Sequence, residues 1–167
     1  MKTLYLKEKD NKYLNNLGGI VDEQDLRILR ALQKNGRMKR SALAEHIGLS
    51  IPSVSERLNK LEENGVIEGY YARLNRKAFG FDLMAFIVVV MESSKHYKEL
   101  RANVDKMPQI LECYSALGEG SHLLKVVVKD SDSLEKLLTQ IQAWPGVTRT
   151  VTSFILSTIK ETSVLDI

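Results

Sequence analysis

Apolar residues recur at helical spacing in three stretches between residues 22 and 64. Each stretch has one apolar stripe, and the stripes consist of Leu26, Leu29 and Leu32, then Leu43, Ala44 and Ile47, then Val54, Leu58 and Leu61. Asp22, with Asp25 at the N3 position, has the character of an N-cap for the first helix. Three short helices are therefore predicted over this part of the chain.

A Gly-Leu-Ser turn separates the second of these helices from the third. Gly48 suits a helix C-terminus because a residue without Cβ adopts left-handed backbone angles readily. Ser50 then acts as an N-cap, and Pro52 falls in the first turn, where a backbone N–H is not needed. A short helix, a turn and a longer amphipathic helix over residues 43–65 predict a DNA-reading helix-turn-helix, although an ordinary helical hairpin with a solvated face has the same pattern.

From residue 83 onward, strand-like apolar runs alternate with helical ones. The run LMAFIVVVM at residues 83–91 predicts a strand buried on both faces, and residues 97–107 predict a helix that ends before Pro108. Two further runs, at residues 110–117 and 123–129, flank the sequence GEGS. This spacing predicts a hairpin with a tight, glycine-bearing turn.

A second helix and a fourth strand complete the C-terminal pattern. Asp132 and Glu135 resemble a capping box that opens the helix, and Pro145-Gly146 ends it. The β-branched run at residues 147–159 predicts the last strand. The order β-α-β-β-α-β predicts a ferredoxin-like α+β domain with helices on one face of its sheet. Because the first strand is apolar on both sides, we expect the open face to pair with a second copy of the chain.

Between these two regions, the segment VIEGYYARLN after Gly65 is rich in β-branched and aromatic residues, which predicts a short strand or wing. The first twenty residues show no clear period and are expected to form a flexible or weakly helical arm. The expected organisation is an N-terminal arm at residues 1–20, a (winged) helix-turn-helix domain at 21–66, a strand or linker at 67–82, and a ferredoxin-like domain at 83–167.

Composition and charge narrow the class of protein. Of the 167 residues, 44% are hydrophobic and 27% charged, as in an ordinary globular protein. The net charge of +3 divides unevenly: residues 1–79 have 15 basic and 10 acidic side chains, and residues 80–167 have 9 and 11. Positive charge on the half with the helix-turn-helix is what phosphate neutralisation requires.

Several kinds of site and location are not expected from this sequence. A single cysteine, Cys113, cannot form an internal disulfide, and no Cys or His cluster has metal-site spacing, so neither a metal nor a cofactor is expected. No apolar run reaches the roughly 18 residues that a membrane span needs, and the N-terminus lacks the apolar core of a signal peptide. A reducing, cytoplasmic location and no membrane partner are expected.

The face of the third helix opposite Val54 is polar and carries Glu56 and Lys60, with Ser53, Ser55 and Arg57 on its flanks. Small polar groups near a helix N-terminus fit a major groove and can contact base edges or phosphates. Three further basic residues are candidates for phosphate contacts, with an equally open alternative in which they face only water: Lys39, Arg40 and Arg73.

Taken in order, four sequence blocks resemble the Lrp/AsnC family of bacterial and archaeal transcription regulators. They are VDEQDLRILRALQKNGR, IGLSIPSVSERLNKLEENGVIEGY, ECYSALGEGSHLLKV and WPGV, and the resemblance covers about residues 21–160. The second block is specific, whereas the others are individually weak but correctly ordered. By this resemblance, the recognition-helix positions are occupied by Ser50, Ser53, Ser55, Glu56, Arg57 and Lys60.

The resemblance also implies what the C-terminal domain does. It would pair subunits and bind a small effector, usually an amino acid, near the hairpin turn, and the dimers would assemble into tetramers or octamers. Family members usually have Pro directly after the Ser that starts the recognition helix, whereas Ile51 takes that place here and Pro52 follows within the same turn. We expect this shift to be harmless.

The hairpin turn departs further from the family pattern, which is commonly Gly-Asp-aromatic-Asp. This chain has Gly118, Glu119, Gly120 and Ser121, followed by His122. Glu119 can accept from an ammonium group, and the amides around Gly118 and Gly120 can hold a carboxylate. One acidic group and the aromatic wall are missing, so an alternative stays open in which the glycines only serve a tight hairpin at a subunit contact.

The favoured function is a sequence-specific DNA-binding transcription regulator whose two recognition helices enter successive major grooves of a pseudo-palindromic operator. An effector such as an amino acid would alter its assembly, and no enzymatic activity is expected. One alternative is an enzyme, because relatives of the family decarboxylate a tetrapyrrole, but the basic and His candidates match no acid–base arrangement: His96, His122, Lys125 and Arg149. Another is a sensor whose helix-turn-helix packs against protein. A redox role for Cys113 is disfavoured by its apolar setting in mid-strand.

Overall fold

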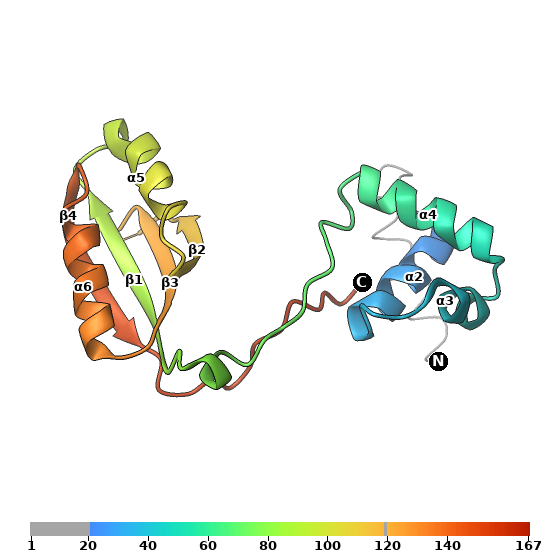
Figure 1. Ribbon diagram of the computed structural model, residues 1–167. Helices are drawn as coiled ribbons and strands as arrows, with labels where there is room; N and C mark the ends of the chain where they lie inside the picture. The colour runs from blue at the N-terminus through green and yellow to red at the C-terminus, as the bar shows by residue number, and fades with distance from the viewer. Residues whose placement is uncertain (1–20, 119) are drawn as a thin grey trace, which may run out of the picture. The chain divides into compact units, whose positions relative to one another are not determined.

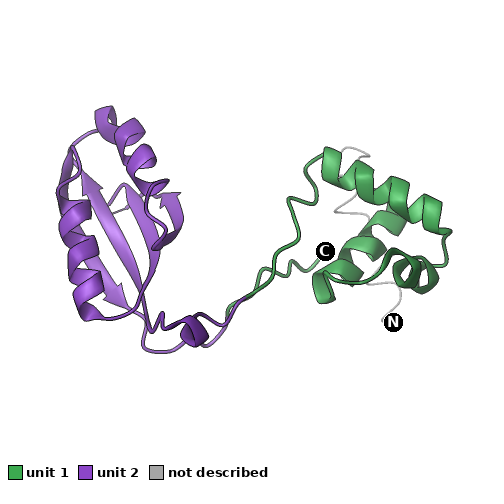
Figure 2. Cartoon of the chain, in the orientation of Figure 1, with its two compact units in different colours: residues 1–73, 161–167 green, residues 74–160 purple. Residues whose placement is uncertain are grey.

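The computed structural model describes residues 21–118 and 120–167, which fall into two units (Figure 2). Unit 1 comprises the described residues up to Arg73 together with Glu161–Ile167, and unit 2 comprises Leu74–Lys160. The predicted N-terminal arm lies outside the described residues. The boundary expected for the C-terminal domain differs at its end, because the last seven residues belong with unit 1 rather than with the sheet.

Three helices build unit 1: α2 (Glu23–Lys34), α3 (Arg40–Ile47) and α4 (Ile51–Glu63) (Figure 1). Their apolar stripes meet in one core, in which Leu26, Leu43 and Leu61 are almost completely buried. The predicted helices are confirmed, but Leu29 and Leu32 of the first stripe are only partly buried. Ile28 and Ala31 instead complete the inner side of α2, so its buried face is rotated from the predicted one.

Within the described residues, the segment after α4 forms no β-strand, so the short strand predicted there is not observed. Residues 66–75 have no regular structure, and the linker forms only a short 3-10 helix, η1 (Arg76–Phe79). A strand exists only by pairing, and no other segment of the described chain hydrogen-bonds along these residues. Val66 and Ile67 still pack partly against the core of unit 1. The side chains of residues 68–75 are open to solvent, with Tyr71 87% and Leu74 68% exposed.

Unit 2 is a four-stranded antiparallel sheet with the order β2-β3-β1-β4. Its strands are β1 (Leu83–Met91), β2 (Ile110–Ser115), β3 (His122–Val128) and β4 (Val147–Phe154). A short 3-10 helix, η2 (Ser94–His96), leads into α5 (Tyr97–Val104), and α6 (Ser131–Gln142) connects β3 to β4 (Figure 1). This is the predicted ferredoxin-like topology, in which each helix joins two strands that are not adjacent in the sheet.

The two faces of the sheet differ in burial. On one face, Ile87 of β1 and Leu124 of β3 are paired in register and pack with Leu100 of α5 and Leu137 of α6. On the other face, Met84 near the start of β1 is buried, whereas Phe86, Val88 and Val90 are only half-buried. The prediction that β1 is buried on both faces therefore fails within a single chain, because both helices cover the same side.

The ends of β4 and α6 also differ from their predicted positions. β4 ends at Phe154 rather than at residue 159, and Leu156 and Ile159 beyond it are almost fully exposed. The N-cap of α6 is Asp130, not Asp132, because the Asp130 carboxylate accepts the N–H of Ser133 at 2.8 Å. None of the described helices is both long and apolar enough to cross a membrane.

The cap of α6 gives a direct test of this local geometry. Replacing Asp130 by Ala removes the acceptor for the Ser133 N–H, and we expect the free energy of unfolding to fall, with a lower midpoint of urea denaturation. Asp132→Ala is the matched control and should cost less, because Asp132 contributes only a favourable charge in the first turn. Urea denaturation followed by circular dichroism measures both variants. Equal losses would contradict the assignment of Asp130 as the cap.

Candidate nucleic-acid interface and hairpin turn

The connection between α3 and α4 is fixed by backbone and side-chain hydrogen bonds. Gly48 adopts a left-handed conformation (φ 79°), and the N–H groups of Gly48 and Leu49 both donate to the carbonyl of Ala44 at 2.9 and 3.0 Å. Ser50 caps α4 by accepting the N–H of Ser53 at 3.3 Å. Because the Ser50 hydroxyl acts there as an acceptor, its own hydrogen can still be donated to a phosphate or a base.

The outward face of α4 carries mixed charge. Glu56 and Lys60 are exposed, whereas Ser53 and Ser55 are half-buried along the same helix. Ser55 also lies at the limit of hydrogen-bond distance from the guanidinium of Arg40 on α3, 3.5 Å away. Two predicted residues, one on each helix, therefore share one side of the motif.

Arg57 points toward the helix bundle rather than only toward solvent. One of its guanidinium nitrogens, Nη1, lies 2.6 Å from Oδ2 of Asp22 and 2.8 Å from Oδ1 of Asp25. The Asp25 side chain is only 3% exposed, and that of Arg57 is 28% exposed. The guanidinium thus neutralises an almost completely buried carboxylate, so Arg57 serves to hold α4 against α2.

The same two aspartates form a reciprocal capping box at the start of α2. Asp22 accepts the N–H of Asp25 at 2.8 Å, and Asp25 accepts the N–H of Asp22 at 3.0 Å. Burial alone would raise the pKa of Asp22, but the backbone N–H of Asp25 and the Arg57 guanidinium outweigh burial and hold it below its usual 3.8. Hydrogen bonds to Asp25 and Asp22 raise the pKa of Arg57 in turn.

The remaining basic candidates differ in how they are held. Lys39 precedes α3, makes no capping hydrogen bond with its side chain and is exposed, as is Arg40. Arg73 in the linker forms an ion pair with Glu161, 2.6 Å away, and donates to the Glu161 carbonyl at 3.1 Å. The structure therefore brings Lys39 and Arg40 to the helix-turn-helix surface, whereas it commits Arg73 to the C-terminal segment.

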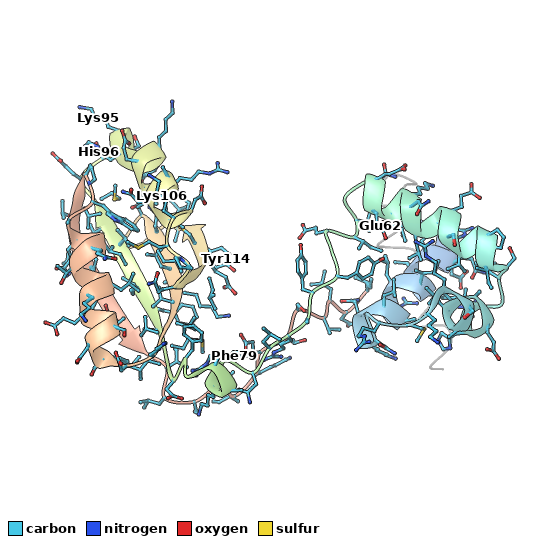
Figure 3. The ribbon with its side chains drawn as sticks, in the orientation of Figure 1. Glu62, Phe79, Lys95, His96, Lys106 and Tyr114 are labelled. Atoms are coloured by element: carbon cyan, nitrogen blue, oxygen red, sulfur yellow. The ribbon has the colours of Figure 1, made fainter. Side chains whose placement is uncertain are left out.

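Sequence reasoning missed two contacts that organise this surface. The first is the cluster of Asp22, Asp25 and Arg57, for which an Asp pair three residues apart was a usable signal. The second joins the start of the linker to α4: the Tyr70 hydroxyl donates to Glu62 at 2.9 Å, and Glu62 is labelled on α4 in Figure 3. Burial, together with the Glu62 carboxylate, raises the pKa of Tyr70 to about 12.

The hairpin turn between β2 and β3 uses its two glycines for different reasons. Gly118 has a positive φ of 142°, which disfavours a side chain. A Cβ on Gly120 would lie 2.3 Å from Cγ1 of Val88 and 3.0 Å from the carbonyl oxygen of Val89, so this position needs glycine because the turn approaches β1 closely. Glu119, the predicted acceptor for an ammonium group, lies outside the described residues.

The two residues that follow Gly120 make contacts within unit 2. Ser121 donates its N–H to Val89 at 3.0 Å, and its carbonyl accepts the N–H of Ala116 at 2.9 Å, which closes the turn. His122 is buried, lies 2.9 Å through Nδ1 from the Ser121 hydroxyl, and packs edge-on against Tyr97 with ring centroids 4.7 Å apart. Burial lowers the pKa of His122, so a neutral imidazole is favoured there.

The four residues considered for an enzymatic site do not converge. His122 is on the helix-covered face of the sheet, whereas Lys125 is on the other face and pairs with Glu112 at 3.0 Å. Arg149 is exposed on β4, and His96 lies against Gly146. Cys113 packs against the helix-covered core, where burial raises the pKa of its thiol. The geometry assembles no acid–base pair from these groups.

Replacing Arg57 separates a positioning role from direct DNA contact. We expect Arg57→Ala to lower the free energy of unfolding by about 2 kcal/mol, because the buried Asp25 carboxylate loses its cation. Lys60→Ala, on the exposed face of the same helix, is the matched control and should leave stability unchanged. Thermal denaturation of both variants tests this; an unchanged midpoint for Arg57→Ala would show that the ion pair is not structural.

With this geometry in place, two family models match the chain. One describes a winged helix-turn-helix DNA-binding domain and matches residues 21–68, and the other describes the Lrp/AsnC ligand binding domain and matches residues 84–165. The chain is also 36% identical over 147 residues to the HTH-type transcriptional regulator FL11 of Pyrococcus abyssi, which covers 88% of this chain and 97% of that relative.

Solved structures agree along nearly the same length. A transcriptional regulator from Neisseria meningitidis in complex with L-methionine has a TM-score of 0.82 at 32% identity, covering 87% of this chain and 96% of that one. A feast or famine regulatory protein from Mycobacterium tuberculosis, complexed with L-methionine, has a TM-score of 0.81 at 34% identity, covering 86% and 97%. On the helix-turn-helix, the ferredoxin-like sheet and these matches, the chain belongs to the Lrp/AsnC family of transcription regulators.

Proposed function

We propose that this chain regulates transcription by inserting α4 into a major groove, with Lys39, Arg40 and Lys60 neutralising phosphates around it. The main support for this proposal is that α4 is held in one position within unit 1. Its N-terminus is capped by Ser50, its inner face is buried, and Arg57 ties it to the start of α2. A helix held in this way presents its polar face in one orientation, which groove recognition requires.

Because the exposed face of α4 has acidic as well as basic groups, one helix supplies limited attraction to DNA. Two copies of unit 1 on one operator would combine their phosphate contacts, so we propose a homodimer that reads a pseudo-palindromic site. The open face of the sheet is the candidate contact between copies. It presents half-buried Phe86, Val88 and Leu123, together with Val151, which is 40% exposed.

We propose further that the hairpin turn binds an amino-acid effector that alters assembly of the dimers into tetramers or octamers. Two relatives of this fold were solved with L-methionine, which makes an amino acid the leading class of ligand. Among the described residues, the N–H of Gly118 has no backbone acceptor, and the amides around Gly118 and Gly120 can receive a carboxylate. Ser121 donates its N–H to the carbonyl of Val89 and accepts the N–H of Ala116, and these two hydrogen bonds close the turn.

DNA binding should be salt-dependent and should depend on Lys60. We expect fluorescence anisotropy with DNA from upstream of the chain's own coding region to show weaker binding for Lys60→Ala. The slope of log affinity against log salt should shrink by about 0.9 for each phosphate that the variant no longer neutralises. Lys136→Ala, on the exposed side of α6 in unit 2, is the matched control and should change neither quantity.

Two results would contradict this mechanism. Binding that does not respond to salt would exclude phosphate neutralisation as its basis. A stable monomer in sedimentation experiments at micromolar concentration would exclude the proposed pair of recognition helices. These two measurements are independent. If sedimentation excludes the dimer, the salt dependence of binding still tests whether α4 binds the groove.

A thermal-shift panel of the twenty amino acids tests the effector. We expect at least one to raise the midpoint of unfolding, because a ligand that binds only the folded state stabilises it. The carboxamide of the same amino acid is the control: it lacks the carboxylate and should give a much smaller shift if the turn amides hold that group. No response to any amino acid would favour a turn that serves only the hairpin or a subunit contact.

A further inference from the structure

The last seven residues of the chain return from the sheet unit to the helix-turn-helix unit. β4 ends at Phe154, and Glu161–Ile167 are grouped with unit 1 (Figure 2). The matched model of the ligand-binding domain extends to residue 165, so this change of unit occurs inside it. We call residues 161–167 the C-terminal tail.

The tail is attached to α2 by the side chain of Gln33, which forms hydrogen bonds with both the carbonyl and the N–H of Leu165. Gln33 donates through Nε2 to the carbonyl of Leu165 at 3.1 Å, and its Oε1 accepts the N–H of Leu165 at 2.6 Å. One turn earlier on the same helix, Nε of Arg30 donates to the backbone oxygen of Ile167 at 2.6 Å. These two α2 residues therefore fix the position of the tail along the helix.

Apolar and ionic contacts support the two ends of this attachment. Ile167 is partly buried against the core of unit 1, so the terminal side chain contributes to the packing of the helix bundle. At the other end of the tail, Glu161 pairs with Arg73 of the linker at 2.6 Å, with both side chains largely open to solvent. An exposed ion pair of this kind contributes little to stability, so the firmer end of the tail is at Ile167.

Two separate segments consequently join the two units, the linker that follows α4 and the chain that leads from β4 into the tail. The tail is the weaker connection. It has no regular structure, and Leu165 in the middle of the Gln33 contact is 69% exposed. A few hydrogen bonds and one half-buried side chain can open locally without unfolding the helices.

We propose that the C-terminal tail is a detachable second tether that restricts how the DNA-reading unit moves relative to the sheet unit. When docked on Arg30 and Gln33, it pre-organises the two copies of unit 1 in a dimer for a two-site operator. When released, it leaves each copy on the linker alone. Its effect on DNA rests on the proposed function, whereas the docking of the tail does not.

The path from the tail to the recognition helix is continuous within unit 1. Gln33 holds the tail near the C-terminus of α2, and at the N-terminus of the same helix Asp25 holds Arg57 of α4. A restraint on α2 is thus passed to α4 through a rigid helix and a neutralised buried carboxylate. Reduced orientational freedom before binding lowers the entropic cost of engaging both half-sites.

Docking can be measured without DNA. Carboxypeptidase digestion of the full chain, followed by mass spectrometry, reports how fast Ile167 is released. We expect Gln33→Ala to speed release by about threefold or more, because the tail is then open more often. Gln24→Ala is the matched control on the same helix, away from the tail, and should leave the rate unchanged. Release from the unmodified chain as fast as from Gln33→Ala would overturn docking.

The tether is tested by comparing two DNA probes, one with two half-sites and one with a single half-site. For Gln33→Ala, and for a chain that ends at Lys160, we expect binding to the two-site probe to weaken by about threefold or more, with unchanged binding to the single site. An equal loss on both probes would overturn the tether and make the tail a structural part of unit 1. If the shortened chain fails to fold, Gln33→Ala still decides. If the unmodified chain binds neither probe, the proposed DNA function fails and so does the tether, while the carboxypeptidase result still decides docking.

Discussion

A carboxylate withdrawn from water at the first turn of α2 is the constraint around which unit 1 is built. Asp25 faces the helix bundle, and a buried charge without a partner would cost several kcal/mol. The guanidinium of Arg57 removes that cost, but only when α4 lies at one position along α2. Asp22 shares the same guanidinium and completes the capping box, so the start of one helix and the middle of the recognition helix are fixed by a single cluster.

Unit 2 is limited by an uncovered sheet face, because both of its helices cover the same side of the sheet. Ile87 and Leu124 then sit in a closed core, while their neighbours Phe86 and Val88 remain half-exposed on the opposite face. A single chain of this topology has no third layer with which to cover that face, which is the physical reason to propose a second copy there. The close approach of Gly120 to Val88 and Val89 also sets the turn tightly against β1.

The periodic features were predictable from sequence, and the features that depend on tertiary partners were not. Helix stripes and strand order follow from local spacing, which explains why the helix-turn-helix and the ferredoxin-like topology emerged correctly. Asp130 and Asp132 are both plausible caps two residues apart, and only the backbone angles choose between them. Arg57 looked like a DNA contact because its position along the helix shows only that it flanks the polar face, not which carboxylates it meets. The strand expected after Gly65 fails for a related reason, since β-propensity cannot supply a pairing partner.

The tail shows how strongly such distant partners shape the chain. Gln33 and Leu165 are separated by 132 positions, and neither has a neighbour in sequence that would suggest their pairing. In the proposed tether, the linker alone would leave unit 1 more orientations, and the second attachment would remove many of them through only a few hydrogen bonds. The two contacts differ in burial. The buried ion pair at Asp25 holds α4 in one orientation on α2, whereas the exposed hydrogen bonds at Gln33 are weak enough for the proposed release of the tail. A regulator that must change its hold on DNA needs both kinds of contact.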